Sequence, residues 1–163
     1  MTRSMIVFGV AVALGVQATT IAQTRPDFSG TWRFNQGKSN PNIAGNTPNI
    51  PFPSQILVAQ TPTEISVEST SVRQQPVSAV YKLDGSKVTV QAPPGISETG
   101  EAKFDGANLV ITSRRSFASP AGEVVVDFRE VWDLAGSVLT IEKTRIQNGD
   151  TSTVKAVYDK VQG

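Results

Sequence analysis

The sequence contains no cysteine and no histidine. Without cysteine the chain can form no disulfide, supply no thiolate to a metal and use no thiol nucleophile, and it cannot carry the cysteine-linked anchor of bacterial lipoproteins. Without histidine it has no Ser-His-Asp or Cys-His machinery and lacks the commonest metal ligand. A carboxylate calcium site would remain possible, but no D-x-[DN]-x-[DN]-G loop is present. We therefore expect neither a metal nor a cofactor.

Charge is also scarce and balanced. Charged residues make up 18% of the 163 residues and hydrophobic ones 39%, which suits one packed domain and a leader rather than a disordered chain. There are 15 basic and 14 acidic residues, so loss of Arg3 with the leader leaves 14 of each. A neutral domain has no electrostatic footprint for nucleic acid or for an anionic membrane.

The segment Met1–Ala22 has the three parts of a secretory signal peptide. Arg3 is the positive start, Met5–Val16 is the apolar run, and Thr20–Ala22 places small residues before a cleavage site at Gln23. The apolar run is shorter than the roughly 20 residues that a membrane-spanning helix needs, which disfavours the alternative of an uncleaved anchor. We expect a periplasmic or secreted protein of residues 23–163 with no membrane span after cleavage.

The mature chain shows short stretches of alternating apolar and polar residues separated by turn signals, and no convincing helical period. Residues 35–54, rich in Asn, Pro and Gly, form the one long predicted loop. Three hairpins are predicted where glycine can adopt a positive φ between alternating strands. The predicted strands and hairpins cover Phe28–Phe34, Gln55–Ala59, Glu64–Thr70, Ala79–Val90 around Asp84-Gly85, Ala102–Thr112 around Asp105-Gly106, Val124–Trp132, Glu130–Ile141 around Ala135-Gly136, Val138–Ile146 and Thr151–Val161.

This pattern predicts an all-β protein with antiparallel up-and-down connections and about eight or nine strands. A sheet of that kind has exposed edges unless it closes on itself, so a single β-barrel is favoured over an open sheet. The alternation assigns one packed face and one wet face to each strand.

Three stretches resemble a family of small exported bacterial proteins described as lipocalin-like, without an assigned activity. They are Gly30–Ser39 with its Gly-Thr-Trp motif, Lys103–Ile111, and Glu130–Leu134. The resemblance implies a lipocalin-like barrel and structural roles for Gly30 and Trp32, with Trp32 closing one end. In lipocalins a late-strand arginine stacks on this tryptophan, and Arg145 is the candidate for that contact.

Five side chains are candidate ligand contacts. Phe128 and Trp132 share one face of their strand and are expected to line the interior. Glu130 is in phase with them, so it either faces inward, as an acid of raised pKa or the partner of an inward arginine, or lies solvated beyond the rim. Arg115 would point inward by its period, but a solvated strand end is favoured because buried arginine is rare without a partner. Tyr81 either donates a hydrogen bond to a ligand or is a core residue.

Two functions from different classes fit the sequence. The first is a binding protein that holds a small apolar molecule inside the barrel, with the 35–54 loop beside the mouth. The second is a non-enzymatic envelope or extracellular interaction module with a filled core, which meets a protein partner through the loop or a strand edge. An enzyme is the least favoured reading, because Glu, Asp or Tyr would have to carry every proton transfer.

Overall fold

The computed structural model describes residues 25–40, 52–71 and 75–162. The predicted signal peptide and the middle of the predicted long loop lie outside these residues. The strands are β1 (Gly30–Phe34), β2 (Gln55–Gln60), β3 (Glu64–Thr70), β4 (Val77–Lys82), β5 (Val88–Thr89), β6 (Ile96–Asp105), β7 (Asn108–Ser119), β8 (Gly122–Ala135), β9 (Val138–Gln147) and β10 (Asp150–Lys160).

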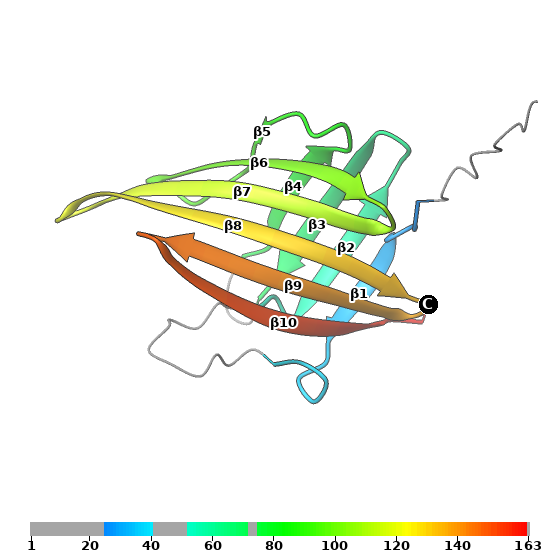
Figure 1. Cartoon of the computed structure of the whole chain (residues 1–163). Coiled ribbons are helices and arrows are strands. Elements are labelled where there is room, and N and C mark those ends of the chain that lie inside the picture. Colours follow the sequence, from blue (N-terminus) through cyan, green and yellow to red (C-terminus); the bar gives the residue numbers. More distant parts are fainter. Residues whose placement is uncertain (1–24, 41–51, 72–74, 163) are drawn as a thin grey trace, which may run out of the picture.

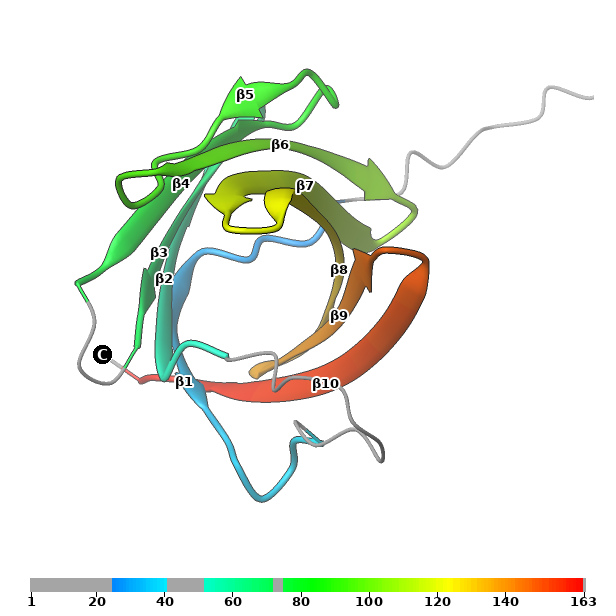
Figure 2. The same ribbon diagram turned by 90° about the vertical axis from the view of Figure 1, so that its left-hand side faces the viewer.

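All ten strands belong to one antiparallel sheet of order β4-β3-β2-β1-β10-β9-β8-β7-β6-β5. The sheet curls until its two ends meet, so the chain forms a nearly closed barrel (Figures 1 and 2). The predicted all-β, up-and-down barrel is confirmed. It has ten strands rather than eight or nine; the shortest, β5, has two residues and pairs with β6. The described residues contain no helix of the length and apolarity that crossing a membrane requires.

Two of the three predicted glycine hairpins are confirmed. Asp105 pairs with Asn108 between β6 and β7, and Ala135 pairs with Val138 between β8 and β9. Gly106 and Gly136 each have φ of 61° and begin a two-residue turn, a conformation that costs glycine little.

The predicted hairpin at Asp84-Gly85 is wrong. The strands on either side of it, β4 and β5, are not hydrogen-bonded neighbours but the two ends of the sheet. Asp84 Oδ1 accepts a hydrogen bond from the Ser86 amide at 2.8 Å, and the Gly85 amide donates to the Ala102 carbonyl at 3.0 Å. The Asp-Gly turn therefore redirects the chain onto β6 and joins the two ends of the sheet.

The seam between β4 and β6 is also closed by side-chain packing. A Cβ atom built on Gly100 of β6 would lie 2.7 Å from Cε1 of Tyr81 on β4, so the tyrosine ring rests directly on the glycine backbone. Tyr81 is buried in this position. The absence of a side chain at residue 100 is what lets β4 and β6 approach across the seam.

One end of the barrel is filled by aromatic side chains. Trp32 is fully buried and donates from Nε1 to the Phe28 carbonyl at 2.9 Å. The Phe28 ring lies 6.0 Å from that of Trp132 and 6.3 Å from that of Phe104, from strands on the opposite wall. The segment preceding β1 crosses this end in Figure 2. Phe28, Trp32 and Phe104 thus pack together at this end of the barrel, and we call them the aromatic plug.

The cation over Trp32 is Lys160 and not Arg145. Lys160 Nζ lies 5.3 Å from the centre of the Trp32 ring, and residues 32 and 160 are paired between β1 and β10. Arg145 pairs with Ser152, which lies eight residues before Lys160 near the start of β10, so Arg145 belongs to the other end of the barrel. Gly30 has φ of +135°, and a Cβ there would lie 2.7 Å from Lys160 Cε. The missing side chain at Gly30 therefore leaves room for the lysine that covers Trp32.

Beyond the barrel wall, β7 and β8 continue as a projecting hairpin (Figure 1). They pair from Leu109↔Trp132 to Ser119↔Gly122, whereas β8 pairs with β9 only from Asp127 onward. Residues 122–126 of β8 are therefore hydrogen-bonded to β7 alone. We call residues 116–126 the arm.

Candidate ligand-binding site

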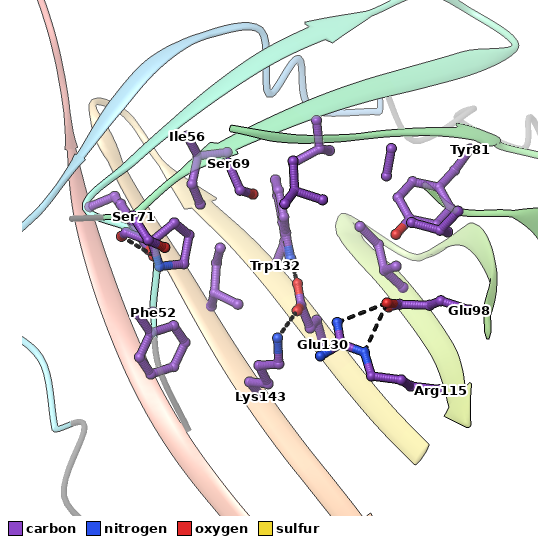
Figure 3. Close-up of a pocket in the computed structure, with 18 of the residues that line it drawn as sticks. Phe52, Ile56, Ser69, Ser71, Tyr81, Glu98, Arg115, Glu130, Trp132 and Lys143 are labelled. Atoms are coloured by element: carbon purple, nitrogen blue, oxygen red, sulfur yellow. Dashed lines mark hydrogen bonds and ion pairs between the residues drawn. The ribbon is translucent and has the colours of Figure 1, made fainter. Parts of the chain in front are cut away.

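A cavity of about 210 Å³ lies inside the barrel, on the side of Trp132 away from the aromatic plug. Phe52 and Pro53, which end the predicted long loop, border it, and so do Ser69 and Ser71 at the end of β3. Figure 3 shows Phe52 at one end of the cavity and Tyr81 at the other. Its apolar lining includes Ile56, Val67, Tyr81, Ile111, Trp132 and Ile141.

Four charged side chains also line the cavity, and the strand register brings them together in pairs. Glu98 of β6 is the direct cross-strand partner of Arg115 on β7, and Glu130 of β8 is the partner of Lys143 on β9. All four have the same phase as buried apolar residues of their strands, so the two-residue period points them inward.

Arg115 is held by Glu98. The guanidinium Nε donates to Oε2 of Glu98 at 2.9 Å, and Nη2 lies 2.8 Å from the same oxygen in an ion pair. The Glu98 side chain is only 10% exposed, whereas that of Arg115 is 40% exposed and reaches toward the opening. The guanidinium also lies 5.6 Å from the centre of the Phe128 ring, which adds a cation–π contact.

Glu130 is held by two donors. Lys143 Nζ lies 2.8 Å from its Oε1, and Trp132 Nε1 donates to its Oε2 at 2.9 Å. Burial alone would raise the pKa of Glu130, but the charge of Lys143 and the hydrogen bonds from Lys143 and Trp132 outweigh it and hold the pKa below its usual range. Glu130 is thus an ionised acceptor near neutral pH, and the sequence-based possibility of a raised pKa is wrong.

The two tyrosines of the cavity remain protonated. Burial, together with the charge of Glu130, raises the pKa of both Tyr81 and Tyr158 far above its ordinary value, and Glu98 adds to this at Tyr81. The Tyr158 hydroxyl donates to the Pro53 carbonyl at 3.1 Å and so fixes the end of the loop at the cavity. Both hydroxyls can therefore act as hydrogen-bond donors.

Four of the five candidate contacts, Tyr81, Arg115, Glu130 and Trp132, meet in this one cavity. Phe128 does not line it but lies behind the charges, with Lys143 Nζ 5.0 Å from its ring centre. Arg115 and Glu130 both line the cavity; the Glu130 side chain is 22% exposed, whereas that of Arg115 is 40% exposed and stays partly solvated. They do not pair with each other, because each already has its own cross-strand partner.

Sequence reasoning missed those two partners, Glu98 and Lys143. Lys143 continues the inward period of Leu139 and Ile141, so the signal was present in the strand pattern. Glu98 precedes the start predicted for its strand at Ala102, because β6 begins six residues earlier at Ile96. The alternation Glu98, Gly100, Ala102 marks the inward face once the strand is extended.

The fold and cavity together define a ten-stranded antiparallel β-barrel with a partly polar interior. No family model matches the chain, and no curated protein matches it in sequence. Among solved structures, a secretory abundant heat soluble (SAHS) protein from Ramazzottius varieornatus superposes with a TM-score of 0.57 at 13% identity, over 85% of this chain and 98% of that one. Secretory abundant heat soluble protein 4 from the same organism gives 0.55 at 16% identity, over 82% and 94%. At these identities the likeness establishes the fold alone, a lipocalin-like barrel.

Proposed function

We propose that this protein is an exported carrier that holds one small, largely apolar molecule inside its barrel. The observation that carries the proposal is the cavity of about 210 Å³, which remains between well-packed walls. Close packing is the rule in protein interiors, so an unfilled space with convergent polar groups is the usual form of a ligand site.

The lining supports an amphipathic ligand. Apolar walls at Ile56, Val67 and Ile141 would bury a hydrocarbon part, at about 25 cal/mol for each Å² removed from water. The charged and hydroxyl side chains would orient a polar end. The cavity is smaller than the range of about 300–1,000 Å³ typical for drug-sized ligands, so the cargo is a small molecule.

A filled interaction module is the alternative, and two observations disfavour it. The interior is not filled. The large apolar side chains exposed on the described surface are Leu57, Val77, Val80, Val125 and Ile146, and they are spread over β2, β4, β8 and β9 rather than gathered on one strand edge. A docking face would concentrate them.

Export remains part of the proposal and rests on the signal-like segment Met1–Ala22. The two structural neighbours are described as secretory, which is in keeping with it.

The test is native mass spectrometry of residues 23–163, with one variant that blocks the cavity and one that does not. Ser69 on β3 faces the cavity, and its neighbour Glu68 faces solvent. Ser69→Trp fills the space with an indole, whereas Glu68→Trp places the same indole outside. Each protein is incubated with a lipid and metabolite extract of the producing organism and measured without detergent.

We expect the wild type and Glu68→Trp to carry one extra mass that is lost on denaturation, and Ser69→Trp to carry none. Identical ligand-free masses for all three proteins would refute the carrier function. An extra mass that persists in Ser69→Trp would move the ligand to another site.

A further inference from the structure

The charges inside the barrel cancel. The cavity is lined by two cations, Arg115 and Lys143, and by two carboxylates, Glu98 and Glu130, each paired within 2.8 Å of its partner. A ligand with a net charge would enter a site that offers no opposite charge in excess and would lose its own hydration. The electrostatics of the cavity therefore favour an uncharged ligand.

Two polar atoms among these side chains still lack a partner. The hydrogen bond and the ion pair from Arg115 both reach Oε2 of Glu98, and Oε1 accepts no hydrogen bond from the described residues. The Tyr81 hydroxyl likewise has no hydrogen bond to a described residue, and only burial and neighbouring charges act on its pKa. Neither atom is sealed off, because the one fully buried side-chain polar atom without a partner in the described parts of the chain is Ser152 Oγ.

These two groups share one wall. The ring of Tyr81 rests on Gly100, two residues beyond Glu98 on the same face of β6. Figure 3 shows Tyr81 and Glu98 together at the end of the cavity opposite Phe52. Carboxylate oxygen accepts only, and a tyrosine hydroxyl both donates and accepts. Together they match one group that donates a hydrogen bond and accepts another.

We propose that the cavity selects a small uncharged amphipathic molecule whose hydroxyl group donates to Glu98 Oε1 and exchanges a hydrogen bond with the Tyr81 hydroxyl. This inference rests on the carrier function and specifies the class of its ligand. A carboxylate fits poorly because its oxygens would face Glu98, whose own oxygen is an acceptor. An alkylammonium satisfies Glu98 but brings an unneutralised charge into the barrel.

Three probes of equal chain length separate these classes: octan-1-ol, octanoate and octylammonium. Their affinities are measured by isothermal titration calorimetry at pH 7, where the acid and the amine are charged. For the wild type we expect octan-1-ol to bind about tenfold or more tightly than either ion, since burying an unneutralised charge costs more than burying a hydrogen-bonded hydroxyl.

A single substitution should cancel the preference for octan-1-ol over octanoate. Glu98→Gln keeps the shape of the side chain but leaves the Arg115 charge without a counter-charge, so octanoate should gain about tenfold or more over octan-1-ol relative to the wild type. Glu101→Gln on the same strand is the matched control. Glu101 lies on the outer face, where it accepts a hydrogen bond from Thr112 Oγ1, so its loss changes the net charge equally and should leave all three affinities unchanged.

The outcomes test the ligand class, the role of Glu98 and the carrier function separately. Tighter binding of octanoate or octylammonium by the wild type would overturn the inference and leave the carrier function standing. Tightest binding of octan-1-ol by the wild type, with the same preference kept in Glu98→Gln, would remove Glu98 from the recognition and overturn the inference too. Binding of none of the three probes, together with ligand-free native masses, would end both proposals.

Discussion

Gly100 is the residue on which closure of the barrel depends most clearly. Its missing side chain leaves room for Tyr81 Cε1, and the next nearest atoms to a Cβ there are the Thr112 carbonyl oxygen at 3.3 Å and Val90 Cγ2 at 3.4 Å. Backbone and buried side chains surround the position, so none of these neighbours can move away freely. A methyl group would have to push β4 away from β6.

We predict that Gly100→Ala lowers the free energy of unfolding by about 1–3 kcal/mol, the usual cost of overpacking a core. Urea denaturation of the variant beside the wild type measures it. Gly37→Ala is the control, because a Cβ at Gly37 meets only Asn35 Oδ1, at an ordinary 3.6 Å. Equal stabilities of the two variants would show that Tyr81 does not hold the seam closed.

Lys143 decides the charge state of Glu130. Because the folded state holds the pKa of Glu130 below its ordinary 4.5, the ion pair contributes to stability above that pH. The contribution is lost as the pH falls below 4.5 and the carboxylate takes up a proton. Without Lys143, burial would dominate and the same carboxylate would be a cost at neutral pH.

We therefore expect Lys143→Met to lose about 1–3 kcal/mol at pH 7, the usual penalty for depriving a largely buried polar group of its partner. The loss should shrink at pH 3.5, because Glu130 is then protonated more readily in the variant than in the wild type. Urea unfolding at the two pH values measures both effects. Lys155→Met, on the exposed face of β10, should show little change at either pH, and a pH-independent loss in Lys143→Met would contradict the coupling.

The sequence predicted which residues line the cavity better than it predicted their ion-pair partners. Period two put Trp132 and Glu130 in the same phase of one long strand, and both line the cavity, although the pattern left open whether Glu130 would lie inside or beyond the rim. It could not assign the ion pairs, because partnership depends on which strands are neighbours and in what register. Glu98 and Lys143 became visible only when β6–β7 and β8–β9 were aligned.

Among the elements, the β7–β8 hairpin is hydrogen-bonded differently at its two ends. Near the barrel, β8 is hydrogen-bonded to β7 and β9, whereas in the arm it has β7 alone. Val125 of the arm is 37% exposed. Backbone hydrogen bonds with few buried contacts open at low free energy.

Native-state hydrogen exchange should resolve this difference within one strand. We predict that amides of residues 122–126 exchange well before those of residues 130–134, because opening the arm leaves the barrel intact. Uniform protection along β8 would mean that the arm and barrel unfold as one unit.

The turns show why some elements were predictable and one was not. At Gly106 and Gly136 the turn joins two strands long enough to pair with each other, so the local signal and the fold agree. At Asp84-Gly85 the turn chemistry is also present, but the strand that follows has only two residues and pairs with β6. A local sequence pattern therefore predicts the turn, but it does not predict which strand the following residues pair with.

For the whole molecule, the edge argument explains why the sheet closes. The two ends of the sheet, β4 and β5, would otherwise offer unpaired backbone groups to other chains. The isolated bridge between Asp84 and Lys103 and the packing of Tyr81 on Gly100 cover this seam. The sequence therefore predicted the barrel, but the cavity depends on how ten sets of side chains fill one interior, which alternation alone does not determine.

The most direct test of the cavity as a ligand site uses the two tryptophans as reporters, one that lines the cavity and one that does not. Trp132 lines the cavity and donates to Glu130, whereas Trp32 lies in the plug and donates to the Phe28 carbonyl. In a protein labelled with ¹⁵N-tryptophan, only these two indole signals are present in residues 23–163. Titration with octan-1-ol should shift the Trp132 indole signal in a saturable way and leave that of Trp32 in place. Two unmoved signals at the highest soluble alcohol concentration, or equal shifts of both, would contradict an interior binding site.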